Sequence, residues 1–238
     1  MPLNDISVSR FPNGISTNAE NTIGASLPFP DPSKYHNFFD DFYDFVAADW
    51  LVTETQAGAS QSLIPVNGGV VQLLNSAALG DINQIQKTPL TTLLDPAKKL
   101  FMKFRLSTSD VNLTHLAVGL MPVVADGTLP AGIPQGIFAI KPSGSTNFTV
   151  YARRDAAANS VSAIASFPVP SGVIGEITFY WDGAGRLYYG TNNAVLGYLT
   201  VPSTSFPNVI LAPTVAIKNG EAVAKNAAVD MIFLAQEI

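Results

Sequence analysis

Cysteine is absent from the 238 residues of this chain, which excludes disulfides, zinc–thiolate sites and thiol catalysis. Charge is scarce as well: 13% of the residues are charged, about half of the usual ~25%. Lysine and arginine number 13 against 18 acidic residues, and no basic run exceeds two residues. A nucleic-acid-binding protein needs a basic stripe, so we expect no nucleic-acid partner. The surface is either neutral and polar or partly covered by partners.

Long apolar runs are also lacking. None approaches the ~18 residues that a membrane-spanning helix needs, and we expect no association with a membrane. The first residues, MPLNDISVSRFPNGIS, contain no basic region followed by an apolar region, the pattern of a secretory signal. We therefore expect a protein that is made in a cytoplasm.

Residues that carry chemistry are few. The two histidines, His36 and His115, have no partner at metal-ligand spacing, and no glutamate has an acidic residue two positions away. A glycosidase needs two carboxyl groups about 5–10 Å apart. The nucleophile elbow, the phosphate-binding loop and the dinucleotide-binding loop are absent as well. These absences predict no enzyme and no cofactor.

One acidic cluster needs a separate interpretation. Asp40, Asp41, Asp44 and Asp49 lie among aromatic residues, and calcium prefers several such hard oxygen ligands. The alternating Asp/Asn pattern of a calcium loop, with its central glycine, is missing. We interpret the carboxylates as caps of a short helix or as groups that solvate an aromatic stretch, with calcium binding as the alternative.

Proline and asparagine are concentrated in residues 1–34, where they indicate turns and extended chain. The segment is either a disordered tail or an arm that becomes ordered on a neighbouring subunit. The arm is favoured because a solvated tail would not need the apolar residues Phe11, Ile15, Ile23, Leu27 and Phe29.

Aromatic residues are densest in the stretch YHNFFDDFYDFVAADW, residues 35–50. Phe38, Phe42 and Phe45 follow the i, i+4, i+7 spacing of one face of a short helix. An extended conformation is equally consistent with the composition, because phenylalanine and tyrosine favour strands.

From Trp50 onward, short apolar-alternating runs are separated by turn residues, the pattern of antiparallel strands. The fold class we predict is all-β, a two-sheet antiparallel jelly-roll sandwich with an extended N-terminal arm. Residues 1–34 are the arm, and residues 35–238 are a single β-sandwich domain. The strands are expected near residues 50–56, 61–66, 69–75, 82–87, 100–107, 115–124, 137–141, 147–153, 160–166, 174–181, 186–190, 195–200, 209–217 and 229–236.

Several of these stretches together resemble a known family. They are YHNFFDDF (35–42) leading to DWLVTETQAG (49–58), GVVQLLN (69–75), ITFYWDG (177–183) with LYY (187–189), and AVDMIF (228–233). In this order they resemble the structural proteins of tailed bacteriophages that have a concanavalin/laminin-G-like jelly roll. These are capsid decoration, or cement, proteins on the outside of the phage head.

The resemblance implies a virion protein of the capsid surface that binds the major capsid protein and stabilises the shell. It also implies a homotrimer at three-fold positions of the lattice. Interface cores are poor in charge and rich in aromatic residues. We therefore expect the subunit contacts to involve Phe11, Ile15, Ile23, Phe29, Tyr35, Phe38, Phe39, Phe42 and Tyr43.

A carbohydrate-binding module of a phage head or tail appendage is the alternative function. Exposed tyrosines that stack on sugar rings would support it, and the candidates are Tyr180, Tyr188, Tyr189 and Tyr198. Packing in the core is the other interpretation of these strand aromatics. A hydrolase, the third hypothesis, would need two carboxylates that face each other in a cleft.

Overall fold

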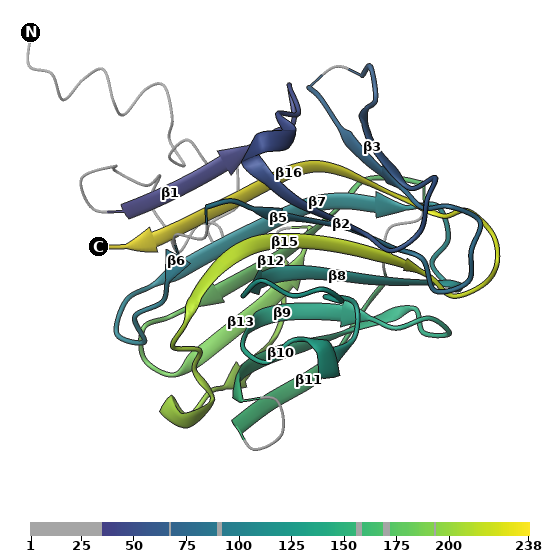
Figure 1. The fold of residues 1–238 in the computed structure, drawn as a ribbon. Helices are drawn as coiled ribbons and strands as arrows, with labels where there is room; N and C mark the ends of the chain where they lie inside the picture. The colour runs from purple at the N-terminus through teal and green to yellow at the C-terminus, as the bar shows by residue number, and fades with distance from the viewer. Residues whose placement is uncertain (1–34, 67, 90–91, 156–158, 169–171, 193) are drawn as a thin grey trace, which may run out of the picture.

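Two antiparallel sheets, stacked face to face, form the protein (Figure 1). The computed structural model describes residues 35–66, 68–89, 92–155, 159–168, 172–192 and 194–238. The first sheet has eight strands. In spatial order they are β14 (Ala194–Thr200), β13 (Arg186–Thr191), β12 (Gly175–Trp181), β7 (Leu100–Thr108), β16 (Asn226–Glu237), β4 (Val71–Leu74) and β3 (Ser60–Leu63), and β1 (Tyr35–Asp40) pairs with β16.

The second sheet also has eight strands. Their spatial order is β11 (Asn159–Pro168), β10 (Asn147–Asp155), β9 (Gly136–Lys141), β8 (Thr114–Met121), β15 (Ile210–Asn219), β5 (Ile82–Lys87) and β2 (Trp50–Glu54), and β6 (Thr92–Leu93) pairs with β15. The described helices are short 3-10 turns: η2 (Ala47–Asp49), η3 (Pro130–Gly132) and η4 (Ser203–Ser205). The all-β sandwich predicted from the sequence is confirmed.

Alternation along the strands places the core between the sheets. In β10, Phe148, Val150 and Ala152 are fully buried, because a strand turns every second side chain to the same face. Phe104 of β7 and Phe179 of β12 meet edge to face with ring centroids 6.3 Å apart. The main core cluster draws on both sheets.

The aromatic stretch after residue 34 adopts the extended alternative, not the helix. Tyr35–Asp40 forms β1 and pairs with the end of β16, from Glu237 to Ile232. The backbone then turns sharply at Phe42, which has a φ of 53°. Phe42 is fully buried, and its ring lies 5.5 Å from that of Trp50. The helical spacing was misleading because the inward Phe38 and the buried Phe42 are separated by this turn.

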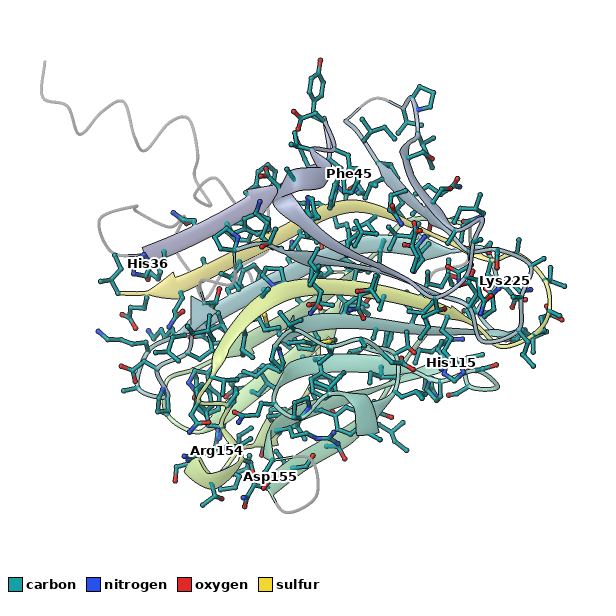
Figure 2. The ribbon with its side chains drawn as sticks, in the orientation of Figure 1. His36, Phe45, His115, Arg154, Asp155 and Lys225 are labelled. Atoms are coloured by element: carbon teal, nitrogen blue, oxygen red, sulfur yellow. The ribbon has the colours of Figure 1, made fainter. Side chains whose placement is uncertain are left out.

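The two ends of the sandwich carry different groups. His36 lies on β1 at one end, while His115 and Lys225 lie at the opposite end (Figure 2). At the first end, a groove of about 640 Å³ runs beside β1 and the end of β16, and its lining includes His36, Asp95 and Lys98.

Candidate functional site

Three tyrosines form a row on the outer face of the first sheet. Tyr180 of β12 is directly opposite Tyr188 of β13, which is opposite Tyr198 of β14. Directly opposed residues of antiparallel strands share a face, so the three rings stand side by side. The ring centroids are 6.0 Å apart between Tyr180 and Tyr188 and 5.7 Å apart between Tyr188 and Tyr198. We call these three residues the tyrosine row.

Further aromatic rings continue the tyrosine row across the same face. Phe101 of β7 is opposite Tyr180, and its ring centroid lies 5.8 Å from that of Phe233 on β16. Phe39 of β1 follows, 6.4 Å from Phe233. The tyrosine row, Phe101, Phe233, Phe39 and the adjacent Tyr35 are called the aromatic stripe below.

Exposure differs along the aromatic stripe. Tyr198 is 52% exposed at one end and Phe39 is 58% exposed at the other, whereas Phe101 is buried in the middle. Tyr180 and Tyr188 are half-buried. Exposed aromatic rings at the ends of such a stripe are typical of a binding site, because water solvates them poorly.

Charged side chains flank the aromatic stripe. Lys103 Nζ lies 3.0 Å from Glu176 Oε2, and Arg105 lies 2.9 Å from Asp230 Oδ2. Burial raises the pKa of Asp230, and the charge of Arg105 opposes that effect. These pairs place donors and acceptors next to flat apolar rings.

The hydroxyl group of Tyr180 keeps its proton at neutral pH. Burial is the largest cause that raises the pKa of Tyr180, and the carboxylate of Asp182 raises it further. A neutral phenol both donates and accepts a hydrogen bond. The ring and the hydroxyl of Tyr180 can therefore contact different parts of a ligand.

The middle of the outer face of the second sheet is covered instead. Residues 122–135 lie over it, held by the amides of Gln84 and Gln86. Gln84 Nε2 donates to Val124 O at 2.8 Å, and Gln86 Nε2 donates to Pro122 O at 2.9 Å. A small apolar cluster, which includes Met121, Ile133 and Phe138, fills the space beneath. This cover buries Phe138, whereas Tyr198 and Phe39 at the two ends of the aromatic stripe stay exposed.

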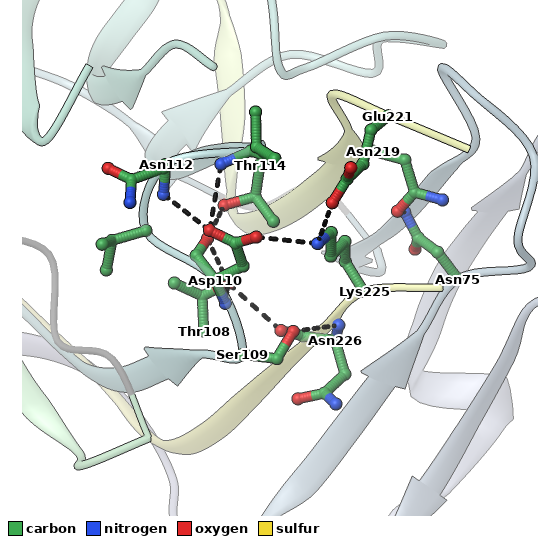
Figure 3. Close-up of polar contacts among 12 residues, drawn as sticks. Asn75, Thr108, Ser109, Asp110, Asn112, Thr114, Asn219, Glu221, Lys225 and Asn226 are labelled. Carbon is green, nitrogen blue, oxygen red and sulfur yellow. Dashed lines mark hydrogen bonds and ion pairs between the residues drawn. The ribbon is translucent and has the colours of Figure 1, made fainter. Parts of the chain in front are cut away.

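A polar cluster joins the loops at the end of the sandwich that carries Lys225 (Figure 3). Lys225 Nζ donates to Asp110 Oδ2 at 2.7 Å and to Glu221 Oε1 at 2.5 Å. The hydrogen bond from Lys225, with those from the backbone N–H groups of Leu113 and Asn112, lowers the pKa of Asp110 to about 2. These contacts tie the loop after β7 to the loop before β16.

Metal-ligating residues do not converge in the described part of the chain. No group of three or more His, Cys, Asp or Glu side chains lies close enough there to hold an ion. Two residues of the acidic cluster have partners within the protein: Asp40 Oδ1 accepts from the N–H of Phe42 at 2.8 Å, and Asp49 lies 3.6 Å from Lys87. Burial lowers the pKa of His115, whose Nδ1 accepts from the N–H of Ser143 at 3.3 Å.

The predicted contact residues fall into several groups. Phe11, Ile15, Ile23 and Phe29 lie outside the described residues. Tyr35 and Phe39 belong to the aromatic stripe. Tyr43 follows β1 in the sequence and is 82% exposed. Phe38 packs inward against the core, and the side chain of Phe42 is fully buried, away from the surface of this fold. The subunit interface itself stays a prediction.

Of the four tyrosines suggested for sugar stacking, Tyr180, Tyr188 and Tyr198 lie together, whereas Tyr189 is buried in the core. Phe101, Phe233 and Arg186 were not anticipated as neighbours of this row. The alternation of FYW and LYY does indicate that adjacent aromatics face opposite sides. It does not indicate which side is open.

In the described residues, no helix is long and apolar enough to cross a membrane.

No family model and no curated protein sequence matches the chain. Solved structures do. An endo-1,3-beta-glucanase from Streptomyces sioyaensis aligns with a TM-score of 0.60 and 11% identity over 88% of this chain and 99% of that one.

Two further structures are similar. The carbohydrate recognition domain of Emp47p has a TM-score of 0.58 and 14% identity, covering 88% of this chain and all 100% of that one. The endo-beta-1,4-glucuronan lyase from Trichoderma reesei has a TM-score of 0.59 and 10% identity, covering 83% of this chain and 94% of that one. At these identities the likeness establishes the fold.

These comparisons correct one prediction. The exclusion of an enzyme was wrong, because a glucanase and a lyase share this fold over most of the chain. The nucleophile elbow and the two nucleotide-binding loops belong to other folds, and the two carboxylates of a glycosidase can converge from distant strands without any local pattern. The jelly-roll part of the family resemblance is supported. The capsid decoration role, the capsid partner, the homotrimer and the location in a virion remain predictions.

Proposed function

We propose that this protein is a carbohydrate-binding domain that holds a glycan along the aromatic stripe. The observation that carries the proposal is the tyrosine row, three rings in cross-strand register on an open sheet face. The same fold in a carbohydrate recognition domain and in a glycan-cleaving enzyme adds support.

The chemistry of the stripe suits a sugar. A pyranose ring has an apolar C–H face, which can stack on an aromatic ring, and hydroxyl groups at its rim. Tyrosine combines an apolar ring with a hydroxyl that can pair with those groups. The ion pairs of Lys103 and Arg105 supply further polar atoms at the margin. Few polar groups beside apolar surface are typical of small-ligand sites.

The surface is open, so the affinity should be modest. A ligand on an exposed sheet face remains partly solvated, and binding must offset its lost translational and rotational freedom. We expect dissociation constants between about 1 μM and 1 mM, or roughly 4–8 kcal/mol of binding free energy. Recognition would then extend over several sugar units.

A glycan array followed by calorimetric titration tests the proposal. The double variant Tyr188→Ala/Tyr198→Ala should bind its best glycan at least about tenfold more weakly than the wild type, a loss of about 1.4 kcal/mol. Tyr198→Phe keeps the ring and should retain most of the affinity. Tyr43→Ala is the matched control, since this tyrosine is 82% exposed but lies outside the tyrosine row.

Thermal melting establishes that each variant is folded. No glycan binding at millimolar concentration refutes the proposal. So does a double variant with undiminished affinity, or an equal loss in the Tyr43 control.

A further inference from the structure

Arg186 stands beside the tyrosine row in an unusual electrostatic position. It is the first residue of β13 and points to the same side as Tyr188, two residues on. Its guanidinium carbon lies 5.1 Å from the centroid of the Tyr198 ring. The side chain is exposed, so the cation is displayed next to the open end of the aromatic stripe.

The cations of this face differ in their partners. Lys103 and Arg105 each have a carboxylate oxygen at 3.0 and 2.9 Å. Arg186 makes no ion pair with any carboxylate among the residues that the structure describes. Asp182 lies in the preceding turn. Its Oδ1 accepts hydrogen bonds from the backbone N–H groups of Ala184, at 2.7 Å, and of Arg186, at 3.0 Å. That oxygen is therefore engaged by the turn.

Two neighbouring tyrosines contact the guanidinium of Arg186. A hydrogen bond with Tyr188 is the largest cause that raises the pKa of Arg186; electrostatic interaction with Tyr188 and Tyr198 adds to it, and the carboxylate of Asp182 contributes least. A guanidinium that lies beside an aromatic ring still presents its planar fork of N–H donors to other acceptors. The fork matches the two oxygens of a carboxylate.

We infer that the tyrosine row selects glycans whose sugar rings carry a carboxylate, which Arg186 binds while the rings of Tyr188 and Tyr198 stack on the sugar. This inference rests on the proposed carbohydrate binding and names its ligand class. The net charge of the chain is −5, so its overall field disfavours anions. Selection must then come from the local contact with Arg186.

Two tetrasaccharides of the same linkage test the inference. Cellotetraose is neutral, and β-1,4-linked tetraglucuronate carries a carboxylate on each ring. Their dissociation constants are measured by calorimetry with the full chain, at low and at physiological ionic strength. We expect the wild type to bind tetraglucuronate at least about tenfold more tightly, which is the size of one charge-assisted hydrogen bond. The preference should shrink as salt rises.

Substitutions then assign the preference. Arg186→Gln should abolish the preference and leave the affinity for cellotetraose within about threefold, because the tyrosine rings remain. Arg186→Lys keeps the charge without the fork and should retain only part of the preference. Arg154→Gln is the control, since it removes the same charge from an exposed arginine on β10 of the other sheet, away from the aromatic stripe.

The outcomes separate the two hypotheses. Equal affinity for both tetrasaccharides, or an unchanged preference in Arg186→Gln, overturns the inference and leaves the proposed function standing. An equal loss in Arg154→Gln overturns the role of Arg186 and points to diffuse electrostatics. Binding of neither tetrasaccharide also overturns the inference, while the glycan array decides separately whether carbohydrate binding itself fails.

Discussion

Asp110→Asn is a sharp test of the loop cluster at the end of the sandwich. The carboxylate accepts from Lys225 through Oδ2 at 2.7 Å. Through Oδ1 it accepts from the backbone N–H groups of Asn112 at 2.8 Å and Leu113 at 3.0 Å. Asparagine has the same shape but no charge. The substitution therefore removes the ionic part of these contacts with little change in packing.

The magnitude follows from the pKa. A fall in the pKa of Asp110 from 3.8 to about 2 corresponds to about 2.5 kcal/mol of folded-state preference for the carboxylate form. The side chain of Asp110 is 24% exposed, so solvent screens part of this energy. We expect Asp110→Asn to lower the free energy of unfolding at pH 7 by about 1–2 kcal/mol.

The pH dependence has a defined sign. Because the pKa of Asp110 is lower in the folded state, its stabilisation is fully present above about pH 4 and is lost as the pH falls toward about 2. Urea denaturation at a series of pH values from 7 to 2 measures the stability difference between wild type and variant.

That difference should disappear across this window. Asp95→Asn, a change in another exposed turn, is the control. A stability difference that stays constant from pH 7 to 2 would falsify the electrostatic explanation.

Three further changes probe the scaffold. Burial lowers the pKa of Lys141 to about 8. Between about pH 8 and 10.5 the unfolded chain holds this proton and the folded protein does not, so the free energy of unfolding of the wild type should rise by up to about 3 kcal/mol. Urea denaturation midpoints of Lys141→Met should lack this rise. Gly119→Ala should cost about 3 kcal/mol in a thermal melt, because the added Cβ would lie 2.4 Å from Ile137 O at a φ of 147°; an unchanged melt contradicts this geometry. Gln84→Leu should expose residues 122–135 to limited proteolysis, because the N–H of Gly127 and the carbonyl of Val124 lose their partner; equal cleavage of wild type and variant would count against it.

Local patterns were sufficient for most strands. Residues 147–153 were predicted as a strand with one apolar face, and β10 spans Asn147–Asp155 with that face fully buried. The alternation is visible in sequence because it repeats every two residues. Tyr35–Asp40 was left between helix and strand, since its aromatic residues suit both. Pairing with β16, nearly two hundred residues away, decides the matter.

The candidate site was only partly accessible from the sequence. Tyrosines on β12, β13 and β14 were recognised as able to stack on sugars, but Tyr188 and its neighbour Tyr189 could not be distinguished. They face opposite sides of one strand, and only the position of the other sheet determines which side is buried.

By itself, the amino-acid sequence determined an all-β protein, because apolar alternation and turn residues act over a few positions. Which rings adjoin, which of them stay exposed and which cation makes no ion pair among the described residues were decided by the tertiary structure. Those properties depend on strands far apart in the chain, such as β7 and β16, and on the loop over the second sheet. Burial and charge pairing are sums over neighbours in space, and no local pattern encodes them.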